Sequence, residues 1–223
     1  MSSAAPTNAA EYWDKYRPHR GEEPQERPAA ERFDWTGLPG NGPGAEVLGD
    51  PKSVLDLGPA EGENAACLAR HGAHVVAVDL SPAQTARART FWKGVPGLEF
   101  VHGEACAFLD QDERLWEAIF STWCAAWFTD PEELLPRVRA RLAPGGVFAF
   151  SHREPIVGQY GAQVMGGKWL EGRETELTVL RWQYTPEQWA DLCKRHGFTT
   201  VQADVIASPE PDRLGTLLVT ARA

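Results

Sequence analysis

A doubly wound α/β domain with a mostly parallel, seven-stranded sheet is expected from three features of the sequence. First, short β-branched or apolar segments alternate with capped helical segments from residue 53 onward. Second, a turn rich in small residues joins the first strand to the first helix. Third, no helix fits between the last two strands, so they form an antiparallel hairpin at the end of the chain.

Strand character recurs along the chain at regular intervals. The segment 74–79, HVVAVD, is a clear example because it is β-branched and apolar. The last two strands are joined through Pro209, Pro211 and Asp212, which leaves no room for the crossover that a parallel pair needs. The strands that we expect lie at 53–57, 74–79, 98–102, 118–122, 147–152, 200–206 and 214–220.

The helices between these strands have recognisable beginnings. Ser81, Asp130 and Thr185 each carry an oxygen that can cap a helix, and a proline follows each of them. A glutamine or glutamate stands three residues after each cap, as in a capping box. Helices are therefore expected from residues 82, 131 and 186, after a first helix at 62–70.

The first 50 residues differ in composition from the rest. Residues 11–20 combine aromatic and charged side chains, and 36–44 have the glycine and proline content of a loop. We therefore expect an N-terminal arm or lid at 1–50 and one α/β domain at 51–223. A long connection at about 153–184 is expected to cover the substrate, or else to form a short extra hairpin over the sheet.

The charge of the chain argues against a nucleic-acid partner. It has 31 acidic and 22 basic side chains, for a formal net charge of −9. A polyanion would be repelled by such a field. Arg137, Arg139 and Arg141 come nearest to a basic cluster, and their spacing places them on the exposed side and at the end of a helix.

Several sequence features bear on location and metals. The four cysteines, Cys67, Cys106, Cys124 and Cys193, form no CxxC pair and no zinc spacing with histidine. No Asp/His cluster suggests a catechol-type magnesium site either, so we expect no metal. Residues 1–10 lack the parts of a signal peptide, and no run approaches 18 apolar residues. We expect a cytoplasmic protein with no membrane contact. The sequence does not decide its oligomeric state.

The turn after the first expected strand carries the strongest functional signal. It contains Asp56, Gly58, Ala60 and Gly62 and leads into a helix. Small residues let a ligand approach the backbone of such a turn, and the following helix N-terminus presents N–H groups to a carboxylate. Taken alone, each glycine could equally mark an ordinary tight turn.

Two further elements lie at the same end of the next strands. Asp79 ends the second strand, where an acidic side chain can accept hydrogen bonds from both ribose hydroxyls. Glu104 and Ala105 follow the third strand and could meet the edge of an adenine. A helix-flanking carboxylate is the alternative for Asp79. Because three successive strands carry such residues at one end, we favour ligand binding.

These segments resemble those of class I S-adenosylmethionine (SAM)-dependent methyltransferases. Residues 56–62 resemble the family's motif I, Asp/Glu-x-Gly-x-Gly-x-Gly, with Ala60 in place of the middle glycine, a change that tightens the backbone approach. Residues 78–82 and 103–105 resemble its second and third elements, and 143–147 its Pro-Gly-Gly turn before strand five.

The resemblance, over about residues 50–220, implies the class I methyltransferase fold, with SAM as cofactor and S-adenosylhomocysteine (SAH) as product. A dinucleotide site is the competing interpretation, but Glu63 occupies the position of the last glycine in Gly-x-Gly-x-x-Gly. The cofactor-binding residues that we expect are Asp56, Gly58, Ala60, Gly62, Asn64, Asp79, Leu80, Gln84, Glu104, Ala105 and Ser121.

The acceptor site is less clearly marked. SAM carries an activated methyl group, so the protein must mainly align the acceptor and exclude water. His152, at the end of the fifth strand, could act as a base or contact the substrate, or serve only a structural purpose. Arg153 and Glu154, which follow it, could instead anchor a polar substrate group or the lid. The aromatic residues could contact ligands or simply pack. Those expected at the substrate or in a lid are Tyr12, Trp13, Tyr16, Trp123, Trp127, Tyr160 and Trp169.

We therefore expect methyl transfer from SAM to a small, aromatic or apolar metabolite by in-line displacement, at an O, N or C atom that the sequence does not decide. Two alternatives remain. A protein or peptide methyltransferase would need a broad acidic groove. A non-catalytic SAM-binding module that regulates a partner would lack an acceptor-sized pocket.

Overall fold

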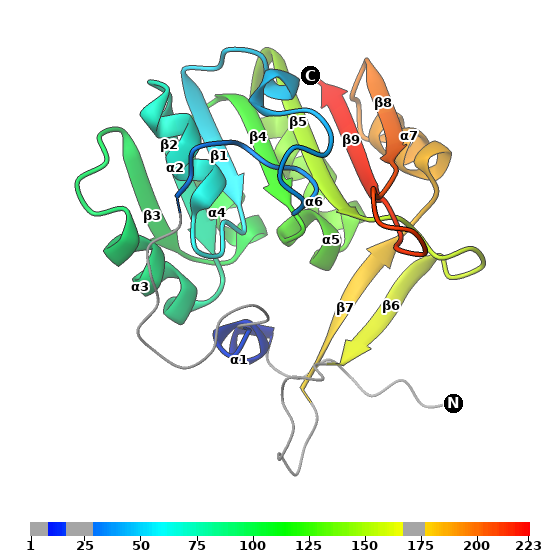
Figure 1. The fold of residues 1–223 in the computed structure, drawn as a ribbon. Coiled ribbons are helices and arrows are strands. Elements are labelled where there is room, and N and C mark those ends of the chain that lie inside the picture. Colours follow the sequence, from blue (N-terminus) through cyan, green and yellow to red (C-terminus); the bar gives the residue numbers. More distant parts are fainter. Residues whose placement is uncertain (1–8, 17–28, 167–176) are drawn as a thin grey trace.

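The computed structural model describes residues 9–16, 29–166 and 177–223. Its main feature is a seven-stranded sheet in the order β3-β2-β1-β4-β5-β9-β8 (Figure 1). All neighbours are parallel except β9, which is antiparallel to β5 and β8, so the expected sheet and terminal hairpin are confirmed. The strands are β1 (Ser53–Leu57), β2 (His74–Asp79), β3 (Leu98–His102), β4 (Trp116–Thr122), β5 (Leu142–Arg153), β8 (Val201–Ile206) and β9 (Thr216–Arg222).

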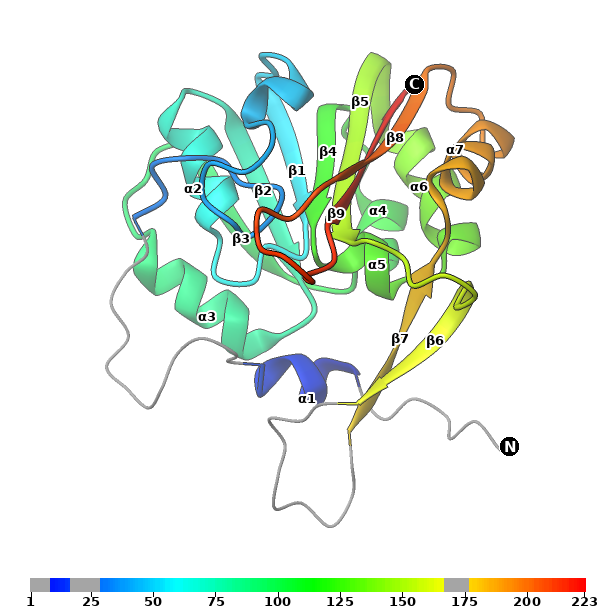
Figure 2. The same ribbon diagram turned by 45° about the vertical axis from the view of Figure 1, so that its right-hand side comes forward.

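Helices cover both faces of this sheet (Figure 2). Alternate strand residues face opposite cores, as the period of a strand requires: Val54 packs toward α2 and α3, and Leu55 toward α4, α6 and α7. Both faces are thereby buried, which suits a mostly parallel sheet. The helices are α2 (Glu63–Arg70), α3 (Pro82–Phe91), α4 (Ala105–Gln111), α5 (Ala125–Phe128), α6 (Pro131–Arg141) and α7 (Pro186–Arg195).

The three helices with predicted caps begin where expected. The side chains of Ser81, Asp130 and Thr185 each accept a hydrogen bond from a backbone N–H of the first turn. At Thr185 the return bond from its own N–H to Gln188 Oε1 (2.9 Å) completes a capping box. The corresponding Gln84 side chain instead donates to carbonyls of the N-terminal segment.

The N-terminal segment has two parts with different positions. Residues 29–50, which include the 3-10 helix η1 (Ala45–Leu48), pack on the sheet: Phe33, Trp35 and Leu48 are buried in the core beside α2. The helix α1 (Ala9–Asp14) instead lies across the carboxyl ends of the parallel strands (Figure 1). Helix α1 therefore occupies the position expected of a lid, whereas residues 29–50 form part of the core.

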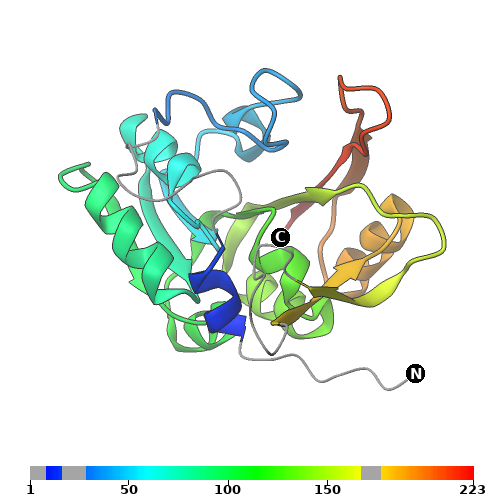
Figure 3. The ribbon, with the colours of Figure 1, turned by 60° about the horizontal axis from the view of Figure 1, so that its bottom comes forward.

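The long connection after β5 forms the short hairpin that we considered as an alternative. Strands β6 (Gly161–Gly166) and β7 (Thr178–Gln183) make a separate two-stranded antiparallel sheet. Figure 3 shows this hairpin and α1 at the carboxyl end of the main sheet. Strand β5 also begins at Leu142, before the expected 147.

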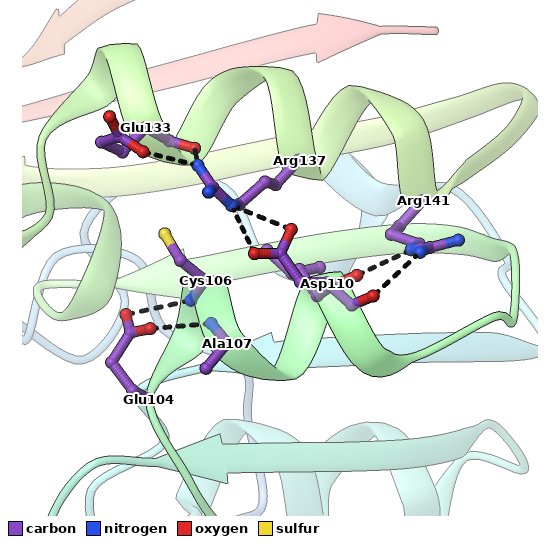
Figure 4. Close-up of polar contacts among 8 residues, drawn as sticks. Glu104, Cys106, Ala107, Asp110, Glu133, Arg137 and Arg141 are labelled. Carbon is purple, nitrogen blue, oxygen red and sulfur yellow. Dashed lines mark hydrogen bonds and ion pairs between the residues drawn. The ribbon is translucent and has the colours of Figure 1, made fainter.

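The arginines of α6 are engaged within the protein. Arg137 Nε donates to both carboxylate oxygens of Asp110 on α4, at 3.0 and 3.1 Å, and Arg137 also pairs with Glu133 (Figure 4). Arg141 Nε donates to the Leu109 carbonyl at 2.7 Å, and Arg139 Nε to the Gly197 carbonyl. These arginines join helices and loops together instead of forming a free basic patch.

Candidate active site

A cavity of about 440 Å³ lies at the carboxyl ends of β1 and β4. Its wall contains the whole turn from Gly58 to Asn64. Residues from distant parts of the chain complete it, and they are Tyr16, Asp34, Gly37, Gln84, Thr122, Trp123 and Cys124. The cavity therefore lies where an open α/β sheet is expected to bind its ligand.

The backbone of the turn needs residues without large side chains. Gly58 and Gly62 have φ values of +85° and +83°, and Ala60 is also left-handed at +50°. A Cβ on Gly58 would lie 2.6 Å from Cys124 Cβ, and one on Gly62 would lie 2.6 Å from the Phe100 ring. Small residues thus let the chain pass close to β4 and β3.

Asp79 holds the backbone of this turn through its carboxylate. Its two carboxylate oxygens accept hydrogen bonds from the N–H groups of Ala60 (3.0 Å) and Ser81 (2.8 Å). The side chain is only 8% exposed, and Asp79 is not among the residues that line the cavity, although its partner Ala60 is. Burial raises the pKa of Asp79, while the two hydrogen bonds act in the opposite direction. Each oxygen keeps acceptor capacity for a ligand hydroxyl.

Asp56 is a second buried carboxyl in the same region. It is 1% exposed, and its Oδ1 has no hydrogen-bond partner among the residues that the structure describes. Burial, followed by the negative charge of Asp79, raises the pKa of Asp56 well above its ordinary value. The carboxyl therefore holds its proton more tightly than an exposed one, and a cation nearby would favour its charged form.

Asn64 connects three segments around the cavity. Its Oδ1 accepts from the Asp34 N–H at 3.0 Å, and its Nδ2 donates to the Asp34 carbonyl and to Thr122 Oγ1. These bonds hold residues 29–50 against the end of β4. The amide of Asn64 is thus engaged in positioning the wall.

The α1 segment is fastened beside the cavity. Gln84 Nε2 donates to the carbonyls of Trp13 (3.3 Å) and Tyr16 (3.1 Å), whereas its buried Oε1 has no partner within the described part of the chain. Asp14 Oδ1 accepts from Ser81 Oγ (2.5 Å) and from the Ala83 N–H (3.2 Å) at the N-terminus of α3. Burial, followed by the charge of Cys124, raises the pKa of Tyr16 to about 12.

The remaining expected cofactor residues lie outside the cavity lining. Ser121 is fully buried, where its Oγ donates to the Leu57 carbonyl and accepts from the Ala126 N–H. Glu104 directs both carboxylate oxygens to the N–H groups of Cys106 and Ala107, so it caps α4 (Figure 4). Ala105 is buried, and the Leu80 carbonyl contacts His102 Nε2. The Glu104 side chain therefore points at its own helix, and only the backbone there stays a predicted adenine contact.

Trp123 and Trp127 occupy different environments. Trp123 lines the cavity with a left-handed φ of +56°, and its Nε1 donates to the Trp35 carbonyl at 2.8 Å. It therefore precedes α5 and does not share one helix with Trp127, although their rings are 5.9 Å apart. The Trp127 ring is buried and stacks on His152 at 5.3 Å with an interplanar angle of 8°.

His152 is fully buried at the end of β5. Its Nδ1 contacts the Arg153 carbonyl at 2.8 Å, and its Nε2 has no partner among the described residues. Burial lowers the pKa of His152 from 6.5 to about 4, with smaller contributions in the same direction from Arg181 and Arg153. The imidazole is consequently neutral at neutral pH.

The expected lid residues are dispersed. Tyr12 is fully buried against Leu177 and Val179, and Trp13 packs edge-on against Phe128. Helix α1 ends at Asp14, so Tyr12 and Tyr16 do not share one helical face. Tyr160 is exposed just before β6 and does not line the cavity, and Trp169 lies outside the described residues.

Several residues of this region were not predicted. Asp14, Asp34, Thr122 and Cys124 contribute contacts that carry no local sequence signal, because their partners are distant in the chain. Of the two arginines near His152, only Arg181 was missed, because its place in the middle of a strand carries no functional signal. Arg153 follows His152 directly in the sequence and was expected to anchor either a polar substrate group or the lid.

The comparison with known families decides the assignment of the fold. Residues 43–203 match a family described as a methyltransferase domain. The chain belongs to this family. Helix-length apolar segments that could cross a membrane are absent from the part of the chain that the structure describes. The same residues contain no group of three or more His, Cys, Asp or Glu side chains placed to hold a metal.

Relatives in this methyltransferase family match parts of the chain. A trans-aconitate 2-methyltransferase of Methylobacterium radiotolerans is 35% identical over 116 residues, covering 48% of this chain and 42% of that protein. A demethylmenaquinone methyltransferase of Clavibacter sepedonicus is 33% identical over 102 residues, covering 46% and 40%. The chain spans less than half the length of the curated relatives that it matches.

Solved structures share the fold. A 1,6-didemethyltoxoflavin-N1-methyltransferase of Burkholderia thailandensis, bound to 1,6-didemethyltoxoflavin and SAH, has a TM-score of 0.59 at 24% identity, covering 80% of this chain and 73% of that one. A SAM-dependent methyltransferase of Mesorhizobium loti has a TM-score of 0.57 at 24% identity, covering 79% and 93%. The expected class I methyltransferase fold is thereby confirmed.

Proposed function

We propose that the protein binds SAM in the cavity beside the 58–64 turn and transfers its methyl group to a small-molecule acceptor. The observation that carries this proposal is the turn itself. Its left-handed positions leave no room for a Cβ at Gly58 or Gly62, so the backbone of the turn forms the cavity wall. Family membership supports the cofactor. SAM, when bound, supplies an activated methyl group on a sulfonium.

The residues present fit such a cofactor. The N–H groups at the start of α2 suit a carboxylate, and the buried Asp56 carboxyl suits an ammonium or sulfonium charge. Asp79 would accept from ribose hydroxyls, and Gln84 Oε1 offers a buried acceptor beside it. Tyr16 and Trp123 line the same cavity and would contact the bound molecule.

The protein's part in the reaction would be alignment and exclusion of water. Helix α1 and the β6–β7 hairpin lie over the carboxyl ends of the strands, where the acceptor must enter (Figure 3). We assign His152 to contact with the acceptor and not to proton removal, because a group with a pKa of about 4 is a weak base at neutral pH.

A small acceptor is favoured over a protein. The hairpin and α1 narrow the approach, whereas a protein substrate would need an open groove. The named relatives methylate small molecules, to judge from their names, trans-aconitate and demethylmenaquinone. We also propose that the protein is cytoplasmic and that its substrate is not a nucleic acid. A non-catalytic SAM-binding module would not need α1 and the β6–β7 hairpin over the carboxyl ends of the strands, so we favour an enzyme.

The proposal can be tested with SAM labelled in its methyl group and an extract separated by size. We expect label in the small-molecule filtrate when wild-type protein is added. A Gly58→Val variant should give none, because its Cβ would meet Cys124 at 2.6 Å and close the turn. A Gly145→Val variant, also at a positive φ but in open space on β5, controls for backbone strain. Label confined to the protein fraction would contradict the proposal.

A further inference from the structure

Two arginines lie near each other on the acceptor side without acidic partners. Arg153 ends β5, and Arg181 lies in the middle of β7. Neither forms an ion pair with any residue in the ranges 9–16, 29–166 and 177–223, whereas five other arginines there do. The Arg181 guanidinium instead contacts the Met165 sulfur (3.7 Å) and lies over the Trp127 ring (5.4 Å).

These two charges are partly buried and repel one another. The Nε atoms of both are buried and without hydrogen-bond partners in the described structure. Burial lowers the pKa of both guanidinium groups, and the charge of Arg153 lowers that of Arg181 further. Two like charges without compensation are costly in a protein interior. Their cost is understandable if a ligand supplies the missing negative charge.

The groups around the pair point to the same conclusion. His152 and Gln183 are both fully buried, and His152 Nε2 and both amide atoms of Gln183 lack partners among the described residues. The indole N–H groups of Trp127 and Trp189 are also buried without acceptors there. Buried polar groups are normally hydrogen-bonded, so this concentration of unpaired polar atoms, the two indole N–H donors among them, marks a place built to hold a ligand.

This cluster adjoins the cofactor cavity through aromatic contacts. The Trp127 ring contacts both Trp123, which lines the cavity, and His152. The Arg181 guanidinium also lies over the Trp127 ring. A molecule held by the arginines would therefore reach toward Trp123 and the cavity.

We infer that Arg153 and Arg181 bind a carboxylate of the acceptor that receives the methyl group. The inference rests on the proposed function and names the class of its substrate. A guanidinium presents a planar fork of donors that matches a carboxylate, and the unused indole N–H groups add further donors. The acceptor is thus a carboxylic acid, which adds a charged group to the aromatic or apolar metabolite that the sequence suggested.

The test uses SAH-loaded protein and calorimetric titration with trans-aconitate, citrate and benzoate, each compared with its neutral methyl ester. We expect at least one acid to bind and its ester to bind at least about tenfold more weakly. Arg153→Gln and Arg181→Gln should each weaken the binding of that acid by about tenfold or more, and Arg181→Lys should weaken it by less. Arg213→Gln, which removes an exposed arginine paired with Glu210, should leave the affinity for the acid unchanged.

Two controls separate the possible failures. SAH affinity should stay within about twofold in every variant, and the thermal midpoint of Arg153→Gln and Arg181→Gln should equal or exceed that of the wild type, because an uncompensated charge is removed. If wild-type protein does not bind SAH, the proposed function itself fails.

Four results would overturn the carboxylate site while leaving the proposed function intact. They are equal binding of acid and ester, no binding of any of the three acids, tighter binding of inorganic phosphate than of any acid, and a loss of SAH affinity in the arginine variants. The last result would mean that the arginines hold the cofactor's own carboxylate.

Discussion

His152 shows how burial determines the chemistry of one side chain. It stacks on Trp127 and contacts Trp189, and no solvent reaches it. Because desolvation disfavours the charged form, its pKa falls to about 4 in the folded protein. The sequence could place this histidine at the end of a strand, but its degree of burial depends on α5 and α7, which are distant in the chain.

The lowered pKa of His152 predicts a dependence of stability on pH. Between about pH 4 and 6.5 the unfolded chain binds more protons at this residue than the folded protein does, so stability rises with pH across this window. The contribution of His152 to the free energy of unfolding is complete above pH 6.5, and roughly 3 kcal/mol of it is lost below pH 4. Urea unfolding of the wild type and of His152→Leu at pH 4.5, 5.5, 6.5 and 7.5 measures this dependence.

The variant should lose less stability than the wild type as the pH falls. A His74→Leu variant, which changes an exposed histidine at the start of β2, should keep the wild-type dependence. Identical pH dependence in wild type and His152→Leu would show that His152 is not buried in its neutral form.

At the residue level, motif-based prediction worked where the backbone itself makes the site. The positions of Gly58, Ala60 and Gly62 follow from local spacing, and all three line the cavity with left-handed conformations. Polar side chains were less predictable. Glu104 caps its own helix, and the Ser121 Oγ donates to the Leu57 carbonyl on the neighbouring strand β1, so both side chains are engaged by the backbone of the fold.

At the level of elements, α1 is positioned by contacts with the N-terminus of α3. Asp14 accepts hydrogen bonds from Ser81 Oγ and the Ala83 N–H, and Gln84 donates to two carbonyls of the same segment. An acidic side chain at a helix N-terminus is stabilising. The helix therefore covers the side of the cavity where Asp79 lies.

The docking of α1 can be weakened by a single change. Asp14→Ala removes a carboxylate from the α3 N-terminus, a loss of about 0.5–2 kcal/mol for such a contact. We expect faster amide hydrogen exchange in Ala9–Asp14 and a several-fold weaker SAH affinity, measured by exchange mass spectrometry and calorimetry. Asp50→Ala, which removes an exposed carboxylate paired with Lys52, serves as the control. Unchanged exchange and affinity would show that α1 is not held by Asp14.

Elements with local signals were predicted better than those without. The caps at Ser81, Asp130 and Thr185 correctly located the starts of α3, α6 and α7, since capping depends on neighbours in sequence. The hairpin of β6 and β7 was only an alternative, because its glycines are equally typical of a mobile loop. Its position over the carboxyl ends depends on tertiary packing against α5.

For the whole molecule, the alternation of strands and helices was enough to predict the sheet. A parallel sheet needs a crossover after each strand, and the missing helix before β9 required an antiparallel hairpin. The strand order brings β1 and β4 together, so the 58–64 turn faces Trp123 and Cys124. The packing of residues 29–50 on the sheet was not predicted, because a glycine-rich segment carries no periodic pattern.

The central claim is that this sheet binds SAM and its product at the 58–64 turn. Calorimetric titration of the purified protein with SAH, with NADH in parallel, tests it most directly. We predict saturable binding of one SAH per chain and no heat of binding with NADH. Binding of NADH without SAH would contradict the account and assign the turn to a dinucleotide.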